Sequence, residues 1–211
     1  MSVGIQAPVT IAELIDQLGV SADRIRYQPL PGTATESDVI ALCDQNIYCE
    51  LIDGVLVEKV VGQYESRMAA WLVYYLLDFV EKGHDIGVVH GADSPHRFFA
   101  GQIRYPDVAF VSYDRLPEGR PTHEPIAPWV PNLAVEIISQ SNTPREMRDK
   151  AEVYFASGVE LVWYVYPTTK TVDVYTSPDA VTTLTADESL DGQHVLPGFT
   201  LSIRKWFDKA E

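Results

Sequence analysis

The sequence predicts one mixed α/β domain, with a central sheet that is flanked by helices and extended by hairpins. Segments whose apolar residues recur at helical spacing alternate with short apolar runs typical of strands. Turn signals join most of the strand-like runs, which favours hairpins, and one run leads into a capped helix. The 211 residues are 46% hydrophobic, which is enough to bury the core of a single domain.

Two short helices are expected in the first part of the chain. Thr10 and Glu13 have the spacing of a capping box, so a helix should begin there and end near Gly19. Residues 28–32 (QPLPG) are typical of a loop. A second helix is expected from about Glu36 to Cys43.

The middle of the chain combines a hairpin, a long helix and further strands. Asp53-Gly54 separates two strand-like runs in YCELIDGVLVEKV, which is a strong hairpin signal. From Gln63 to Lys82 apolar residues recur at helical spacing, and Gly83 ends the pattern. The segments IGVVH, HRFF and RYPDVAFV predict three strands, and residues 117–131 predict a proline-rich surface connection.

The last part of the chain repeats this alternation. LAVEII, residues 133–138, is typical of a central strand. Thr143 as N-cap, Pro144 at the first position and Glu146 in a capping box predict a helix that ends at Gly158. ELVWYVYP and TVDVYT predict a last hairpin, and the tail should carry short strands and a final turn.

We divide the chain into a helical extension, residues 1–45, packed on a single globular domain, residues 46–211. The start, MSVGIQAPVT, lacks the pattern of a signal peptide. The longest uncharged apolar stretch, Ala69–Leu77, is far shorter than the roughly 20 residues of a membrane helix. Cys43 and Cys49 lack the spacing of a zinc or redox motif. We therefore expect no membrane partner and a cytoplasmic location.

The net charge of −14 argues against a broad nucleic-acid-binding surface. Between Arg97 and Lys150, seven basic and seven acidic residues balance, so the flanking segments carry the whole negative charge. This distribution is compatible with a local basic rim around an acidic pocket. Non-specific affinity for DNA should be weak and should fall steeply with salt.

Asp107 and Glu136 are acidic residues placed in apolar runs. Every neighbour of Glu136 in LAVEII is apolar, and a glutamate buried in a central strand is unfavourable unless it is paired, protonated or bound to a metal. Asp107 stands at the mouth of the run Val108–Val111. Two carboxylates at strand ends offer the hard oxygen ligands that Mg²⁺ and Mn²⁺ prefer. The alternatives are an edge strand whose Glu136 faces water and an ordinary aspartate that starts a strand.

Lys150 and Glu50 are further candidates. Lys150 lies on the helix after the Glu136 strand, and Glu146, Lys150 and Tyr154 share one helix face. From there the lysine could stabilise charge that develops over the strand ends or position a water. Alternatively, it is an exposed partner of Glu146. Glu50, in YCELIDG, lies near the same site or is a solvated acid of the hairpin.

Taken together, several runs resemble the Uma-two family of restriction endonucleases, which belongs to the PD-(D/E)XK nuclease superfamily. The runs are YCELIDG, RYPDVAFV, LAVEIISQSN, DKAEVYFASGV, LVWYVYP and VLPGF. The similarity extends over roughly Tyr48 to Phe207, in the order of the family. It implies a restriction-endonuclease-like core, which is a central mixed sheet with flanking helices.

The resemblance also implies the roles of particular residues. It assigns the motif aspartate to Asp107, the second acid to Glu136, and the acid of the opening segment to Glu50. The superfamily's lysine normally stands two residues after the second acid, where this chain has Ile138. Proteins similar to this one carry the lysine on the next helix, which matches Lys150.

Two functions from different classes are compatible with these residues. The first is a Mg²⁺- or Mn²⁺-dependent DNA endonuclease. In it Asp107 and Glu136 hold the ion, helped by Glu50 and by the carbonyl of Ile137, and Lys150 acts on the water or the transition state. The second is a catalytically inactive nuclease-like scaffold that binds protein or nucleic acid, which the broken motif and the net charge favour. A homodimer is expected.

Overall fold

The computed structural model describes residues 10–211. Residues 1–9, the first part of the expected N-terminal extension, lie outside the described residues. The larger sheet has six strands in the order β10-β9-β8-β7-β6-β3. The strands of this sheet are β3 (Gly87–His90), β6 (Val108–Ser112), β7 (Leu133–Ile137), β8 (Leu161–Tyr166), β9 (Thr171–Ser177) and β10 (Ala180–Leu184). Strands β7 and β8 run parallel and the other neighbours run antiparallel, so the sheet is mixed.

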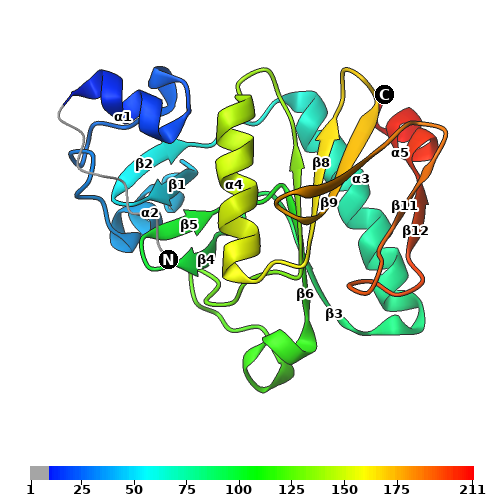
Figure 1. Ribbon diagram of the computed structural model, residues 1–211. Helices are drawn as coiled ribbons and strands as arrows, with labels where there is room; N and C mark the ends of the chain where they lie inside the picture. The colour runs from blue at the N-terminus through cyan, green and yellow to red at the C-terminus, as the bar shows by residue number, and fades with distance from the viewer. Residues whose placement is uncertain (1–9) are drawn as a thin grey trace.

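Helices cover both faces of the six-stranded sheet (Figure 1). Helix α4 (Pro144–Ser157) packs on one face, whereas α3 (Gln63–Phe79) and α5 (Ile203–Ala210) pack on the other. Helix α4 also connects the parallel strands β7 and β8, which is the usual reason for a helix at this position. Among residues 10–211, no helix is long and apolar enough to cross a membrane.

A second sheet stands beside α4, with four strands in the order β2-β1-β5-β4. Its strands are β1 (Cys49–Ile52), β2 (Val55–Glu58), β4 (His96–Phe99) and β5 (Gln102–Arg104). Helix α1 (Ile11–Leu18) packs on Val55 and Val57, and helix α2 (Glu36–Cys43) packs on Cys49 and Leu51. A two-stranded sheet of β11 (Ser189–Asp191) and β12 (Thr200–Ser202) precedes α5.

Local signals in the sequence set most of these boundaries. Helix α4 begins at the predicted capping box, in which Thr143 accepts from the Glu146 N–H and Glu146 accepts from the Thr143 N–H. It ends at Gly158, whose φ of 104° is the left-handed conformation that suits glycine. Helices α1 and α2 and the β1–β2 hairpin also lie where they were predicted.

One predicted strand is divided in the structure. RYPDVAFV was predicted as one strand candidate with Asp107 at the mouth of the run Val108–Val111, whereas in the structure β5 ends at Arg104 and β6 starts at Val108. Pro106 lies in the break, where its missing N–H removes a bond from the ladder. The division sends Arg104 to the four-stranded sheet and Asp107 to the six-stranded sheet.

Helix α3 ends at Phe79 and continues as one wider turn over Val80–His84, in which Gly83, with a φ of 112°, ends the helical run as predicted. The end of the chain, in contrast, was predicted wrongly. The tail ends in the eight-residue helix α5 rather than in a turn. The Trp206 indole N–H of α5 donates to the Met68 carbonyl of α3 at 3.0 Å, which fixes α5 against the core.

Candidate active site

Strand alternation places the Glu136 side chain under helix α4. Leu133, Val135 and Ile137 of β7 pack in the core shared with α3 and α5, whereas Ala134 packs with residues of α4. Glu136 is two residues after Ala134 on the strand, so its side chain points to the same face of the sheet, towards α4. It is only 5% exposed, so the prediction of a buried glutamate is confirmed and an edge strand facing water is excluded.

Asp107 lies at the start of β6, immediately beside Glu136 on β7. Val108 pairs with Val135 in the ladder, and the Asp107 N–H donates to the Val135 carbonyl at 2.9 Å. The Asp107 Oδ2 accepts from the Ile137 N–H at 2.7 Å. These two bonds hold Asp107 to the residues on either side of Glu136, so both carboxylates lie at the same point of the sheet.

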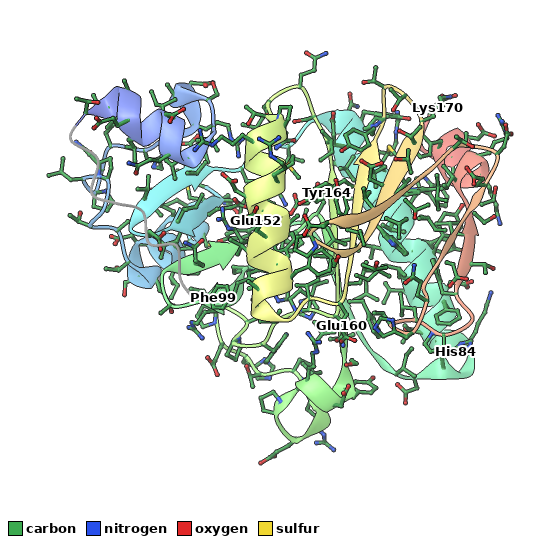
Figure 2. The ribbon with its side chains drawn as sticks, viewed as in Figure 1. His84, Phe99, Glu152, Glu160, Tyr164 and Lys170 are labelled. Carbon is green, nitrogen blue, oxygen red and sulfur yellow. The ribbon has the colours of Figure 1, made fainter. Side chains whose placement is uncertain are left out.

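Helix α4 brings Lys150 and Tyr154 onto Glu136. The Lys150 ammonium lies 3.2 Å from Glu136 Oε2 and 3.0 Å from Glu50 Oε1. One turn later, the Tyr154 hydroxyl donates to Glu136 Oε1. Lys150 is 5% exposed, so it is a buried partner of two acids and is not an exposed partner of Glu146. Figure 2 shows side chains filling the space between α4 and the strands behind it. Tyr164 is one of these side chains and packs with residues of α4.

Glu50 approaches this group from the four-stranded sheet. It is 2% exposed and is therefore not a solvated hairpin acid. Its Oε2 accepts from Arg104 at 3.0 Å, and Leu51 pairs with Ile103 next to them in the ladder. Glu50 thus ties Arg104 to Lys150 and joins the two sheets under α4.

Lys59 completes the group, although sequence reasoning did not single it out. It follows β2, and its ammonium lies 2.8 Å from Asp107 Oδ1. It also donates to the carbonyls of Tyr105 at 2.6 Å and Ala92 at 3.1 Å. We call Glu50, Asp107, Glu136, Lys59, Arg104 and Lys150 the acid–base cluster.

Burial and neighbouring charges together raise the pKa of Glu136 but lower the pKa of Glu50. Burial raises the pKa of Glu136 to about 7. The negative charges of Asp107 and Glu50 also raise this pKa, whereas the positive charges of Lys150 and Lys59 lower it. Burial acts in the same sense on Glu50, but Lys150 and Arg104 outweigh it and lower its pKa to about 2. Lys150 keeps its proton because Glu136 and Glu50 outweigh burial and raise its pKa.

The cluster can offer oxygen ligands to a divalent cation. Asp107 Oδ1 and the carbonyls of Tyr105 and Ala92 already surround a positive group, the Lys59 ammonium. Mg²⁺ is commonly bound through one or two carboxylates, with water and substrate oxygens completing its shell. Asp107 and Glu136 fit an ion held in this way. Within residues 10–211, no group of three or more His, Cys, Asp or Glu residues is arranged to hold a metal.

The N-terminal helical region contacts α4 close to the cluster. Arg24 lies 2.9 Å from Glu146 in the first turn of α4, and each side chain is 5% exposed. The Arg24 Nε also donates to the Glu58 carbonyl, next to Lys59. Through these contacts, Arg24 links the N-terminal helical extension to the site. The boundary between extension and domain at residue 45 stays a prediction.

The site brings together the residues named from the sequence and adds two cluster members and one neighbour, Tyr154. Asp107, Glu136, Lys150 and Glu50 converge, and Ile137 reaches Asp107 through its N–H; their roles as ligands and catalysts stay predictions. The added residues are Lys59, Arg104 and Tyr154. Tyr154 had a signal, since it follows Lys150 by four residues on the same helix face.

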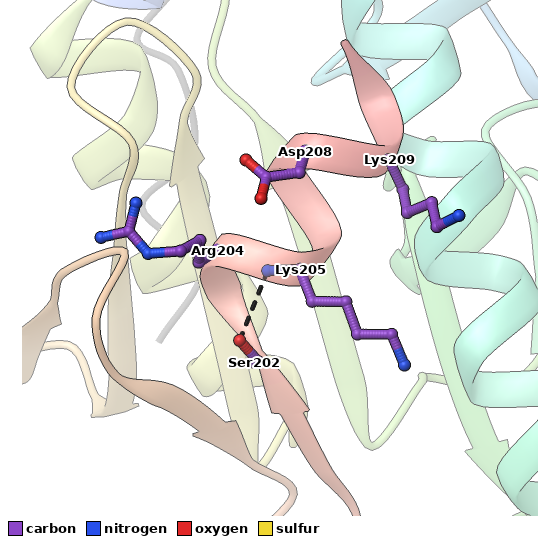
Figure 3. A pocket seen from close by; sticks show the side chains of 5 residues that line it. All are labelled: Ser202, Arg204, Lys205, Asp208 and Lys209. Carbon is purple, nitrogen blue, oxygen red and sulfur yellow. Dashed lines mark hydrogen bonds between the residues drawn. The ribbon is translucent and has the colours of Figure 1, made fainter.

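Two surface hollows lie away from the cluster. One of about 480 Å³ is lined by Ser202, Arg204, Lys205, Asp208 and Lys209 of the α5 region (Figure 3). The other, of about 290 Å³, is lined by Arg115, Pro117, Pro128, Trp129 and Val130. No member of the acid–base cluster lines either hollow, and α5 covers the opposite face of the sheet from α4. The chemistry described above therefore belongs to the buried cluster.

Comparison with known families agrees with this architecture. The family model described as "Uma2: Putative restriction endonuclease" matches residues 37–204. The chain belongs to the Uma2 family. The family predicted from the sequence is thus confirmed, and the match includes every member of the acid–base cluster but not Arg24, which holds α4 from outside it.

A solved structure shows the same fold as this Uma2 member. It is described as the "Crystal structure of a putative nuclease belonging to DUF820 from Anabaena variabilis ATCC 29413". The TM-score is 0.69 at 19% sequence identity, and the match covers 79% of this chain and 93% of that chain. The predicted restriction-endonuclease-like fold is therefore confirmed. A search of curated proteins finds no match to this chain.

Proposed function

We propose that the chain is a Mg²⁺- or Mn²⁺-dependent DNA endonuclease that works at the acid–base cluster. The observation that carries the proposal is the Lys150 ammonium, buried between Glu136 and Glu50 at 3.2 and 3.0 Å. Lys150 is on a helix and not at the usual motif position, which Ile138 occupies, yet its ammonium still contacts the second acid, Glu136. This contact supports a nuclease site. Membership of the Uma2 family supports the same class of activity.

Asp107 and Glu136 would hold the divalent ion, with the Ile137 carbonyl beside them. When bound, the ion supplies positive charge that polarises a phosphoryl oxygen and makes water more acidic. Asp107 is held in place by its bond to the Ile137 N–H, so its carboxylate would need little reorganisation. Glu136, with its raised pKa, would release a proton when it becomes a ligand.

Lys150 would stabilise the transition state as a cation. Burial opposes its charge, but Glu136 and Glu50 raise its pKa, so it does not accept a proton from water near neutral pH. In hydrolysis the water oxygen bonds to phosphorus, one phosphorus–oxygen ester bond breaks, and the departing oxygen takes up a proton. Lys150 can offset the negative charge of the phosphoryl oxygens in that step. Glu50 would position Lys150 and stand near the ion as a further acid.

The DNA partner is expected to bind weakly and without strong sequence preference. The net charge of −14 leaves few surfaces for phosphate contacts, so binding should fade quickly as salt rises. We propose a homodimer in the cytoplasm; the two cysteines, Cys43 and Cys49, are free thiols, which supports the reducing compartment. Light scattering in solution tests the dimer directly.

A catalytically inactive scaffold is the second candidate, and two observations favour it. The cluster contains three acids and three bases, so its formal charge is balanced without an added ion. Moreover, Glu136 and Asp107 each have partners at both carboxylate oxygens. A scaffold of this kind would have no reason to bind Mn²⁺.

Cleavage of plasmid DNA at low salt with Mn²⁺ or Mg²⁺ tests the proposal. The wild type should cut, and Glu136→Gln should not, because the amide keeps the size of the side chain but cannot supply the negative charge. Glu152→Gln is the matched control, since it removes one exposed carboxylate from α4, the helix that covers Glu136 (Figure 2). Wild-type protein that cuts neither DNA nor RNA contradicts the endonuclease. Equal cutting by Glu136→Gln reveals a contaminating nuclease.

A further inference from the structure

Lys59 is held in the cluster like a bound cation. Its three N–H donors have three oxygen partners, namely Asp107 Oδ1 at 2.8 Å, the Tyr105 carbonyl at 2.6 Å and the Ala92 carbonyl at 3.1 Å. The side chain is only 10% exposed. One carboxylate and two carbonyls form a set of hard oxygen donors, which is also the donor type preferred by small divalent cations.

The Lys59 ammonium uses the oxygen of Asp107 that a metal would need. Asp107 Oδ2 accepts from the Ile137 N–H within the sheet, and Lys59 takes Oδ1. The positive charge of Lys59 also acts on Glu136, where it opposes the rise in pKa caused by burial. Lys59 is therefore close to both acids that are proposed as metal ligands.

We propose that Lys59 is a resident counterion that exchanges with the divalent cation, so that its ammonium leaves Asp107 when the metal binds. The inference rests on the proposed metal site and adds a competing residue to it. A dication bound to Asp107 would stand next to a lysine ammonium in a poorly solvated place, and like charges repel strongly there. Exchange removes that repulsion.

The position of Lys59 allows such a movement. It follows the last residue of β2, and the next residue, Val60, is 53% exposed, so solvent is within reach of the lysine's flexible stem. The other charged groups around the acids are fixed more firmly. Lys150 contacts two carboxylates, and Arg104 contacts Glu50 and Gln102. Lys59 is the cluster cation that is held by one carboxylate and two backbone carbonyls.

Mn²⁺ titration of variants tests the exchange by affinity rather than by activity. Lys59→Met keeps the length of the side chain and removes the competing charge, so Mn²⁺ should bind at least about tenfold more tightly. Lys82→Met is the matched control. Lys82 is a surface residue with 72% side-chain exposure that pairs with Asp78, and its loss changes net charge equally. Its Mn²⁺ affinity should stay within about twofold of the wild type.

The outcomes separate the exchange from the metal site. Equal or weaker Mn²⁺ binding by Lys59→Met, with clear binding by the wild type, overturns the exchange and leaves the metal site intact. Mn²⁺ binding by Lys59→Met alone supports the exchange. Failure of both proteins to bind Mn²⁺ contradicts the metal site, and the exchange with it.

Amine labelling of the wild type gives a second readout that does not depend on folding of a variant. Lys59 should react slowly with an acylating reagent in the presence of a chelator and several-fold faster when Mn²⁺ is added. Lys150 should stay protected in both conditions because it remains between Glu50 and Glu136. Mass spectrometry of the peptides reports each lysine separately. Unchanged labelling of Lys59 under saturating Mn²⁺ would overturn the exchange.

Discussion

The substitution Glu136→Gln should change how the stability of the fold depends on pH. Burial raises the pKa of Glu136 to about 7 from its ordinary 4.5, and Asp107 and Glu50 add to the rise. The folded protein therefore holds a proton on Glu136 that the unfolded protein has lost between these pH values. The stabilising contribution is fully present below pH 4.5 and is lost as pH rises through 7.

The expected size of the effect follows from the two pKa values. The gap between 4.5 and about 7 corresponds to roughly 3 kcal/mol of unfolding free energy, at 1.36 kcal/mol per pKa unit. Glutamine does not titrate, so this loss between pH 4.5 and pH near 8 should be absent in Glu136→Gln. Loss of the carboxylate that accepts from Lys150 and Tyr154 adds an offset that does not depend on pH in this range.

Urea unfolding followed by tryptophan fluorescence, with a chelator present, measures these free energies across the pH range. Glu50→Gln is the matched control. Burial acts against ionisation of Glu50, but Lys150 and Arg104 lower its pKa to about 2, so its contribution is present above 4.5 and is lost as pH falls through about 2. Above pH 4.5 its curve should still fall as pH rises, but by less than the wild type, because the Glu50 charge that adds to the raised pKa of Glu136 is gone. Parallel curves for the wild type and Glu136→Gln would show that the pKa of Glu136 is not raised in the folded protein.

Two further predictions concern Lys150 and Arg24, which contact the strand and helix that carry the site. Lys150→Ala should lower turnover about 100-fold. Mn²⁺ affinity should change by less than a factor of about ten in that variant, because Lys150 stabilises charge rather than holding the ion; calorimetry and single-turnover kinetics separate the two. Arg24→Met should destabilise the fold by about 3–5 kcal/mol, because Glu146 is left buried without its cation. Adding Glu146→Gln should recover much of that loss in urea unfolding.

Local chemistry explains why much of the site could be predicted from the sequence. Glu136 is surrounded by apolar neighbours on a strand, which by itself requires a partner for its charge. The capping box at Thr143 fixes where α4 begins, and helical spacing then fixes which face carries Lys150 and Tyr154. These features depend on residues that are close together along the chain.

The remaining parts of the site depend on contacts between distant segments. Lys59 meets Asp107 only because β2 and the start of β6 are brought together by two different sheets. Arg104 faces Glu50 because β5 pairs with β1 before the chain changes sheets at Pro106, whereas RYPDVAFV was predicted as a single strand candidate. Helix α5 had a signal that was not used. Its buried residues Ile203, Trp206, Phe207 and Ala210 follow helical spacing.

Anomalous diffraction from crystals soaked in Mn²⁺ tests most directly whether Asp107 and Glu136 hold a metal. We expect one strong anomalous peak between the two carboxylates, at metal–oxygen distances of about 2.0–2.2 Å. The Ile137 carbonyl should lie beside the ion, and the Lys59 ammonium should have left Asp107 Oδ1. A map without a peak at the acid–base cluster, or with Mn²⁺ only at surface acids, would contradict the central claim.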